Sequence, residues 1–249
     1  MKEYTRRFSN RVSDYTKYRP DYPATAFEFL QKRYQLTNNS VVADVGSGTG
    51  LFTDHLVKHG CQVHAVEPNE PMRAESDKRL SNNPNYQSHP GTAEATTLRD
   101  NSVDLVTMAQ AFHWFDQTRT ATEVSRILKP GGSIALIWNR RDGSISAFLR
   151  DYNELLRTMI PEYSKVNHMN LQDEALLEWI GPGAELHQFP HAQQFDFEGL
   201  RGRLMSSSYC PTPDNPIHEP LMQQLEQLHA RHASSGLVAF IYETSLYVS

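Results

Sequence analysis

The fold of this chain is decided by one stretch of its sequence, Val41-Val42-Ala43-Asp44-Val45-Gly46-Ser47-Gly48-Thr49-Gly50. Residues 41–45 form a mostly apolar run typical of a buried strand, and the glycines after it allow a tight turn into a helix predicted from about Leu51. A strand that ends in such a turn presents backbone N–H groups at the carboxyl edge of a parallel sheet, where open α/β folds bind ligands. The stretch therefore predicts an α/β fold with a ligand at this turn, which we call the glycine loop (residues 46–50).

The residues that follow the glycine loop alternate between short β-rich runs and segments with helical periodicity. We predict helices at 51–60, at about 72–80, and from the N-cap Asp116 to the break at Lys129-Pro130-Gly131-Gly132. Strands are predicted at 61–67, near Tyr86, at 103–109 and at 133–138. This alternation is the pattern of βαβ units, whose right-handed crossovers build a doubly wound, Rossmann-like parallel sheet.

The remainder of the chain is less regular and predicts a mostly helical cap. Amphipathic helices are expected at about 145–160, 171–180 and 221–232, and a strand is expected at 186–197. A last strand places Val238, Phe240, Tyr242, Leu246 and Val248 on one face, so the terminus is expected to return to the sheet as its seventh strand. The predicted organisation is a lid and first helix (1–39), a ligand-binding core (40–142), a cap (143–235) and a terminal strand (236–249).

Composition argues against several kinds of partner. The chain has 24 Lys+Arg and 29 Asp+Glu, a formal charge of −5, and no basic run that would follow a phosphate backbone, so no nucleic-acid partner is expected. No segment approaches the roughly 18 apolar residues of a membrane span, and the start lacks the apolar stretch of a signal peptide. We therefore expect a cytoplasmic protein that does not bind membranes. Its oligomeric state, monomer or homodimer, is left open by the sequence.

The glycine loop differs from the pattern that binds dinucleotides. That pattern requires glycine at position 51, where this chain has Leu51. Asp44, which only Val45 separates from the glycines, would repel a pyrophosphate but attract an ammonium group. Glu67 ends the next predicted strand, about 20 residues on, where an acidic side chain accepts both hydroxyls of a ribose. These positions favour a cationic amino-acid ligand joined to a ribose over a nicotinamide cofactor and its oxidoreductase chemistry.

Residues 41–50 resemble the first motif of the class I S-adenosylmethionine-dependent methyltransferases, of the methyltransferase type 11 kind. Gly91-Thr92-Ala93-Glu94 resembles that family's loop after strand three, which borders the adenine, although many members carry an acid where this chain has Thr92. Residues 128–132 resemble the family's turn before strand five. The resemblance implies S-adenosylmethionine as cofactor and S-adenosylhomocysteine as product. We assign to this cofactor Tyr15, Tyr18, Arg19, Asp44, Gly46, Ser47, Gly48, Gly50, Glu67, Pro68, Met72, Thr92, Ala93, Glu94, Gln110 and Ala111.

A narrower resemblance concerns the acceptor of the methyl group. Residues 109–116 and 18–23 are similar to the trans-aconitate methyltransferase-like branch, whose members methylate small carboxylic acids and related compounds. This resemblance implies a small-molecule acceptor and favours O-methylation of a carboxylate, which arginines would neutralise; the candidates are Arg11, Arg19, Arg140 and Arg141. The alternatives are a hydroxyl or nitrogen of a secondary metabolite, and a catalytically silent protein that binds the cofactor only.

The loop after the fourth strand is expected to border the transferred methyl group. We assign Arg11, His113, Trp114 and Phe115 to the acceptor and His113 to catalysis. The imidazole would act either as a general base for a hydroxyl or amine, or as a hydrogen-bonding contact for a carboxylate. In a lid formed by this segment, Tyr15 and Tyr18 would cover the cationic cofactor with their rings, and Arg19 would pair with the carboxylate of the cofactor or with an acidic substrate; an ordinary amphipathic helix is the alternative.

Other chemistries are not indicated by the sequence. Gly46-Ser47-Gly48 is too short for the nucleophile elbow of a serine hydrolase. His187 and His191 have the spacing of a zinc pair, but Pro190 interrupts any helix between them, and Cys61 and Cys210 form no metal pattern, so no metal is predicted. An enzyme that methylates DNA amino groups would carry Asn/Asp-Pro-Pro-aromatic after strand four, where this chain has Gln110-Ala111-Phe112-His113.

Overall fold

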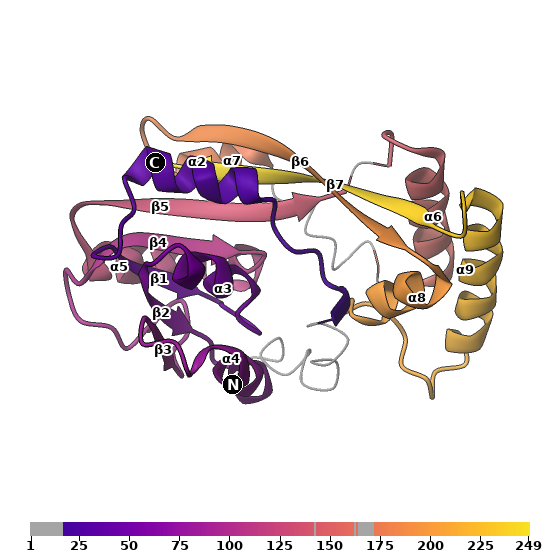
Figure 1. The fold of residues 1–249 in the computed structure, drawn as a ribbon, viewed down its shortest axis with the longest axis horizontal. Coiled ribbons are helices and arrows are strands. Elements are labelled where there is room, and N and C mark those ends of the chain that lie inside the picture. Colours follow the sequence, from indigo (N-terminus) through magenta and orange to yellow (C-terminus); the bar gives the residue numbers. More distant parts are fainter. Residues whose placement is uncertain (1–16, 142, 162, 164–171) are drawn as a thin grey trace.

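The computed structural model describes residues 17–141, 143–161, 163 and 172–249. Within these residues the strands form one sheet of order β3-β2-β1-β4-β5-β7-β6 (Figure 1). The strands are β1 (Val41–Val45), β2 (Gln62–Val66), β3 (Tyr86–His89), β4 (Val103–Ala109), β5 (Leu128–Arg140), β6 (Glu185–Phe195) and β7 (Val238–Val248). β1 to β5 are parallel, and β7 is antiparallel to both of its neighbours. The predicted doubly wound, seven-stranded sheet is confirmed.

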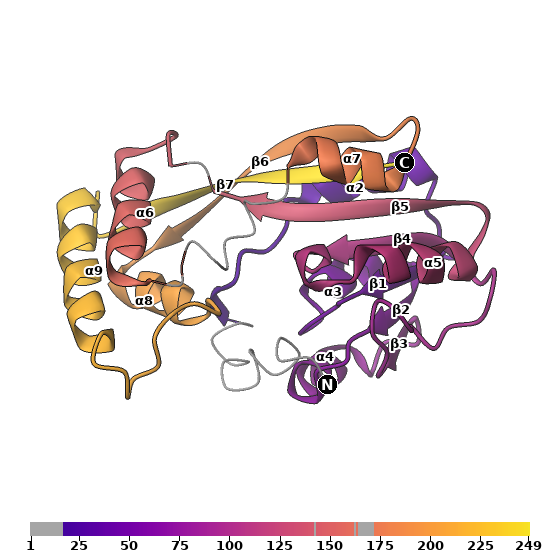
Figure 2. The same ribbon diagram turned by 180° about the vertical axis from the view of Figure 1, so that it is seen from behind.

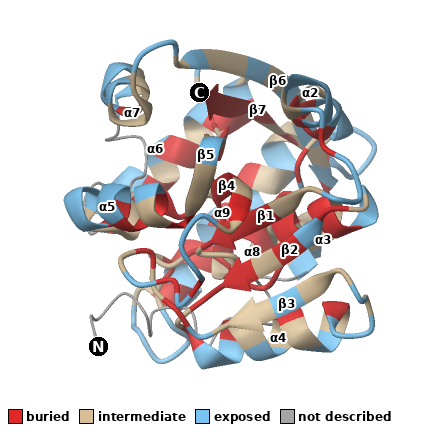
Figure 3. Ribbon diagram, turned by 90° about the vertical axis from the view of Figure 1, so that its left-hand side faces the viewer, coloured by how far each residue is buried: buried red, intermediate tan, exposed pale blue. Residues whose placement is uncertain are grey.

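Helices cover both faces of this sheet, so its central strands are buried (Figure 3). The helices are α2 (Ala24–Tyr34), α3 (Leu51–Lys58), α4 (Glu70–Leu80), α5 (Gln117–Ile127), α6 (Ala147–Met159), α7 (Asp173–Ile180), α8 (Phe197–Met205), α9 (His218–His232) and the 3-10 turn η2 (Phe112–Trp114). Apolar residues of α2 and α3 pack on one face. Those of α5 and α7 pack on the other. None of the helices in this part of the chain has the length and apolar character required to cross a membrane.

Most predicted boundaries agree with the structure to within a few residues, and two elements differ. β5 begins at Leu128 rather than Ser133, because Leu128 already pairs with Val103 before the turn at Pro130–Gly132 interrupts the register. The helix before it accordingly ends at Ile127. α8 was not predicted at all; it begins after Asp196, whose side chain accepts a hydrogen bond from the Gly199 N–H at 2.8 Å.

The cap is formed by α6, α8 and α9 at the end of the molecule farthest from β3, and both ribbon views show β6 and β7 extending from the sheet into it (Figures 1 and 2). The prediction that the terminal strand returns to the sheet is confirmed. Its apolar face is divided between two cores: Phe240 and Tyr242 pack in the cap, whereas Leu246 and Val248 pack against α2 and α3. The last strand therefore joins the cap to the core.

Candidate active site

The glycine loop lies at the carboxyl end of β1, in the position that the sequence predicts. The backbone N–H groups of Gly46 and Ser47 both donate to the carbonyl of Val66 in β2, at 2.8 Å and 3.2 Å. Gly46 has φ of 73°, in the left-handed region that favours glycine. Gly50 is the N-cap of α3. The loop is thus fixed to the neighbouring strand while its remaining backbone faces the edge of the sheet.

Gly46 is also closely approached by the loop that follows β4. A Cβ atom on Gly46 would lie 2.6 Å from Cβ of Ala111 and 2.9 Å from the ring of Phe115. A Cβ atom on Gly48 would lie 3.4 Å from the methyl group of Met72 in α4. The structure therefore brings together four residues that the sequence analysis assigned to the cofactor. They come from three separate segments of the chain: Gly46 and Gly48, Met72, and Ala111.

Asp44 is fully buried beneath the glycine loop. One carboxylate oxygen accepts a hydrogen bond from the Thr53 hydroxyl at 2.6 Å, and the other accepts one from the Thr107 hydroxyl at 3.0 Å. Burial raises the pKa of Asp44 to about 6, an effect that these two hydrogen bonds limit. In this structure the carboxylate supports the loop from below, and its attraction for a ligand's ammonium group stays a prediction.

Glu67 links the glycine loop to the turn before α4. Its side chain accepts hydrogen bonds from the backbone N–H of Gly48 at 2.9 Å and from that of Asn69 at 2.7 Å. Burial raises the pKa of Glu67, although both N–H donors act to lower it. Asn69 in turn caps α4 by accepting from the Met72 N–H at 3.1 Å, which starts that helix earlier than predicted, at Glu70. Pro68 and Met72 therefore lie on the segment that Glu67 holds against the loop.

The loop after β3 contacts the loop after β4. Thr92 and Ala95 exchange backbone hydrogen bonds at 3.1 Å, which closes a small turn around the buried Ala93. The carboxylate of Glu94 accepts a hydrogen bond from the backbone N–H of Asp116 at 3.0 Å. Asp116 itself caps α5, as predicted, by accepting from the Arg119 N–H. Glu94 thus joins two loops at the edge of the sheet, and its predicted contact with an adenine is not tested by this structure.

The loop after β4 begins with a strained residue. Gln110 has φ of 57°, which costs about 1–2 kcal/mol for a residue other than glycine. Two hydrogen bonds to β5 hold it there: its N–H donates to the carbonyl of Ile137 and its side chain donates to the carbonyl of Asn139. This conformation turns the chain into η2, on which the rings of His113 and Trp114 lie 4.6 Å apart. Such strain is typical of functional loops.

His113 combines burial with a nearby positive charge. Burial, and then the charge of Arg19, lower the pKa of His113 to about 4. The imidazole is therefore neutral near pH 7, where it offers one N–H donor and one nitrogen acceptor. A conjugate acid of such low pKa makes His113 a weak general base.

Comparisons with known proteins agree with this geometry. The profile of a methyltransferase domain matches residues 43–136. An uncharacterized methyltransferase of Mycobacterium tuberculosis is 33% identical over 241 residues, which cover 95% of this chain and 92% of that protein. An uncharacterized methyltransferase of Schizosaccharomyces pombe is 32% identical over 229 residues, covering 90% and 85%. The chain belongs to the class I S-adenosylmethionine-dependent methyltransferases.

Solved structures show the same fold as this methyltransferase. A protein described as a type II methyltransferase from Anaeromyxobacter dehalogenans has a TM-score of 0.63 at 22% identity, over 92% of this chain and 95% of that one. Phosphoethanolamine N-methyltransferase 2 of Haemonchus contortus, in complex with phosphomonomethylethanolamine and S-adenosylhomocysteine, has a TM-score of 0.59 at 14% identity, over 99% and 58%. The protein is an enzyme, and its cofactor is S-adenosylmethionine.

The glycine loop of the methyltransferase has polar groups left over for this cofactor. The hydroxyl groups of Ser47 and Thr49 are buried and have no hydrogen-bond partner among the described residues. Buried hydroxyl groups rarely lack a hydrogen-bond partner in folded proteins. Together with the carboxylate of Glu67, whose oxygens can each accept more than one hydrogen bond, these hydroxyls form a set of donors and acceptors that fits a polar, ribose-bearing ligand.

The segment before α2 lies against the cap. The ring of Tyr18 occupies the space where Gly202 of α8 would carry a side chain. The guanidinium of Arg19 donates to the carbonyl of Ser206 at 3.0 Å. Of the other predicted lid and acceptor residues, Tyr15 and Arg11 lie outside the described residues. In the described part of this segment, Tyr18 and Arg19 contact α8 and the residues after it.

Two of the candidate arginines have different surroundings. Arg140 forms an ion pair with Asp173 of α7 at 2.5 Å. Arg141, the next residue, is 5% exposed and points into the cap, where its guanidinium donates to the hydroxyls of Tyr163 and Tyr209. Sequence reasoning missed a second buried arginine, Arg203 of α8, because nothing in the local pattern distinguishes it from a surface residue of an unpredicted helix.

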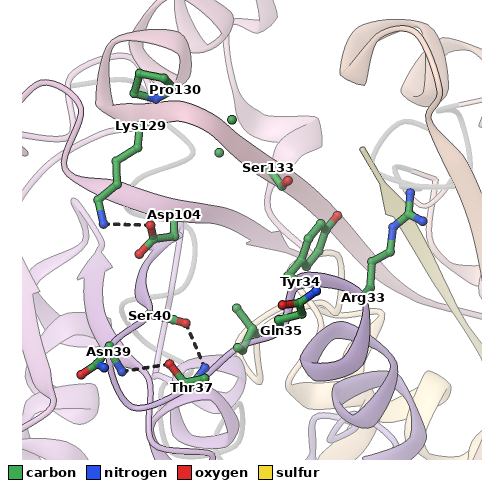
Figure 4. Close-up of a pocket in the computed structure, with 13 residues that line it drawn as sticks. Arg33, Tyr34, Gln35, Thr37, Asn39, Ser40, Asp104, Lys129, Pro130 and Ser133 are labelled. Carbon is green, nitrogen blue, oxygen red and sulfur yellow. Dashed lines mark hydrogen bonds and ion pairs between the residues drawn. The ribbon is translucent and has the colours of Figure 1, made fainter.

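A cavity of about 520 Å³ lies elsewhere, at the amino ends of the strands, between the end of α2 and the start of β5 (Figure 4). Tyr34 and Ser133 line it, and Lys129 forms an ion pair with Asp104 at 2.8 Å beside it. This is the opposite edge of the sheet from the glycine loop. The cavity therefore does not belong to the methyltransferase site.

Within the described residues, no group of His, Cys, Asp or Glu side chains could hold a metal ion.

Proposed function

We propose that this methyltransferase transfers the methyl group to a carboxylate oxygen of a small organic acid. The observation that supports this most is the environment of His113, whose imidazole is neutral and only weakly basic beside the positive charge of Arg19. A carboxylate is already ionised near pH 7 and needs no base, whereas an amine or a phenol must lose a proton before or during attack. A weakly basic imidazole beside a positive charge therefore suits a carboxylate acceptor better than an amine or a phenol.

The cofactor supplies a methyl group attached to a sulfonium, from which the neutral thioether is a good leaving group. The protein therefore contributes mainly by positioning the two reactants and excluding water from them. Glu67 and the glycine loop are the groups expected to hold the cofactor, with Asp44 providing negative charge beneath them. His113 donates its N–H to one acceptor oxygen, which leaves the other oxygen free to attack. Arg19 balances the charge of the acid until it becomes a neutral ester.

Methyl transfer to a panel of acceptors tests this function. The protein is incubated with methyl-labelled S-adenosylmethionine and small aliphatic acids, phenols or primary amines. We expect label only in the acids, in a form released by mild alkali, as a methyl ester is. Transfer to amines or phenols alone would overturn the proposal, and binding of S-adenosylhomocysteine without transfer to any acceptor would favour a silent cofactor-binding protein.

A second test separates the role of His113 from that of a base. His113→Asn keeps a hydrogen-bond donor but cannot accept a proton. If the imidazole only binds the carboxylate, this variant retains kcat within about threefold and loses mainly affinity for the acid. A general base would instead be worth about a hundredfold or more in kcat.

A further inference from the structure

Two arginines, Arg141 and Arg203, are buried together inside the cap. Each is 5% exposed. Arg141 directly follows β5, and Arg203 lies on α8. Their guanidinium carbons lie 5.4 Å and 5.5 Å from the centroid of one ring, that of Phe240 in β7. Two like charges therefore share one aromatic side chain in the interior of the cap.

The hydrogen-bond partners of both arginines are hydroxyl groups. Arg141 donates to the Tyr163 hydroxyl at 3.2 Å and to the Tyr209 hydroxyl at 3.3 Å. Arg203 donates to the hydroxyls of Tyr242, at 2.9 Å, and Ser207, at 3.1 Å. No acidic residue in the described part of the chain forms an ion pair with either arginine. Buried charges in proteins are normally paired, and no carboxylate among the described residues balances these two.

The same cluster has polar groups that face no acceptor. Nη1 of Arg141 and the hydroxyl of Tyr152 are fully buried, and neither has a hydrogen-bond partner among the described residues. The two side chains are adjacent, since the guanidinium of Arg141 lies 5.4 Å from the centroid of the Tyr152 ring. A guanidinium N–H and a phenolic O–H side by side are suited to the two oxygens of one oxyanion.

The electrostatic effect of the cluster is visible on Tyr209. Burial alone raises the pKa of this phenol, but the charges of Arg141 and Arg203, with a smaller contribution from Arg19, hold it below its ordinary value. Arg19 acts on Tyr209 here and on His113 in the methyl-transfer site. Arg19 also donates to the carbonyl of Ser206, whose neighbour Ser207 accepts a hydrogen bond from Arg203, so Arg19 lies close to the cluster.

We propose that Arg141 and Arg203 bind a second oxyanion of the acceptor, one that is not methylated. This rests on the proposed function, in which the reacting carboxylate lies beside His113 and Arg19. The second group is a carboxylate or a phosphate, because both present oxygens that a guanidinium fork and a phenol can donate to. The preferred acceptor then carries at least two anionic groups, and the two arginines select it over an acid with one.

Steady-state kinetics with paired acceptors test this site. Short dicarboxylic acids are compared with their monoamides, which keep the reacting carboxylate and replace the second one by a neutral group; acids with a terminal phosphate form a third set. Arg203→Gln is expected to raise KM for the diacid by about ten- to a hundredfold, and to change KM for the monoamide by less than about threefold. The better of the diacid and phosphate sets identifies the second group.

The matched control is Arg201→Gln, two residues away on α8. Arg201 lies at the surface in an ion pair with Glu198 at 3.6 Å, so its removal changes the same charge on the same helix outside the cluster. It should leave both KM values unchanged within about twofold. Two results would overturn the inference. One is that Arg203→Gln raises KM for the diacid and for the monoamide equally; the other is that Arg203→Gln and Arg201→Gln raise KM for the diacid equally.

A second variant covers the case in which Arg203→Gln does not fold. Tyr152→Phe removes one hydroxyl that has no partner among the described residues, and should weaken diacid binding severalfold without lowering thermal stability. Calorimetry of the S-adenosylhomocysteine-loaded protein with the diacids provides a readout that needs no methyl transfer. Diacid binding that depends on Tyr152, with no acid methylated, would leave this site standing and reject the proposed function. Methylation of diacids and monoamides with equal KM in the native protein would support the proposed function and reject the second oxyanion site.

Discussion

Asp44 and Glu67 are two buried acids on either side of the glycine loop, and they are held by different kinds of donor. Asp44 accepts from two threonine hydroxyls, which can rotate and either donate or accept. Glu67 accepts from two backbone N–H groups, which can only donate. Fixed donors favour the charged form of Glu67, whereas the two hydroxyls beside Asp44 can serve either protonation state, although the backbone of Thr53 also favours the charged form of Asp44. Asp44 is therefore the residue where charge, stability and ligand binding can be separated by mutation.

Asp44→Asn is expected to stabilise the protein at neutral and alkaline pH. The pKa of Asp44 is raised from 3.8 to about 6 on folding, so the folded state retains a proton that the unfolded chain releases between these values. Above pH 6 the folded state must hold a buried charge, which costs up to about 3 kcal/mol at about 1.4 kcal/mol per pKa unit. The gain in free energy of unfolding, measured by urea titration, should be greatest near pH 8 and vanish below about pH 4.

The control is Asp54→Asn, which removes from α3 a carboxylate paired with Lys58 of the same helix and Arg79 of α4, and should give no gain at any pH. If Asp44 also attracts the ammonium group of the cofactor, the stabilised variant binds S-adenosylhomocysteine at least about tenfold more weakly. A variant that is no more stable than the native protein at pH 8 would show that the threonines already offset the burial of the charge.

Gly46→Ala tests the close approach at the glycine loop. Its Cβ atom would lie 2.6 Å from that of Ala111, in addition to the strain of alanine at φ of 73°. Gly131→Ala is the matched control, because it has φ of 80° and nothing within 4 Å of the added atom. We expect Gly131→Ala to cost about 1–2 kcal/mol from strain alone and to leave S-adenosylhomocysteine affinity unchanged. Gly46→Ala should cost more and weaken binding at least about tenfold; equal effects in the two variants would reject a role for the contact.

At the scale of secondary structure, the predictable elements are those whose signals are local. β1 and β4 match their predicted bounds because each is a mostly apolar run that stops at a loop. α8 was missed because Gly199 and Gly202 are helix-weakening residues within its nine positions. Gly202 is required by the ring of Tyr18, a contact between residues far apart in the sequence. Glu67 could be predicted as a site residue because its signal, an acid at the end of a strand about 20 residues after the glycines, is local. Arg203 could not, because Arg203 becomes buried only once the cap has formed.

Gly202→Ala tests how the segment before α2 is held on α8. Alanine in place of glycine within a helix normally stabilises by up to about 1 kcal/mol. Here the added methyl group would overlap the ring of Tyr18, so we expect the variant to be less stable than the native protein in thermal denaturation. In a Tyr18→Ala background the ring is absent, and the same substitution should become stabilising. A substitution effect of the same sign in both backgrounds would show that Tyr18 does not lie on α8 in solution.

At the scale of the whole molecule, the enzyme consists of a cofactor-binding edge and a cap that meet around His113 and Arg19. Glu67, Glu94 and Asp116 tie the loops of the edge to one another. The cap has an apolar core of its own, built by α6, α8, α9 and the first half of β7. In the proposed function, the cofactor and the acceptor would therefore contact largely different parts of the chain.

Hydrogen exchange can resolve these two parts. Binding of S-adenosylhomocysteine is expected to slow exchange of the amides in the glycine loop and at the start of α4. A diacid added afterwards should slow exchange in α8 and after β5, where Arg203 and Arg141 lie. The middle of α9 packs on α6 and supplies no residue to either site, so it serves as the internal reference. Uniform slowing throughout the chain with either ligand would contradict this division.

The position of β7 has a consequence for synthesis of the chain. β7 lies between β5 and β6 in the sheet, yet it follows both of them in the chain and is therefore synthesised after them. Until then β5 and β6 have no strand between them, and the cap lacks Phe240, the ring on which both buried arginines rest. Amino-terminal parts of a protein generally fold first during translation. Here neither the sheet nor the arginine cluster of the cap can be completed before β7 has left the ribosome, so the enzyme is expected to become active only after β7 has been made.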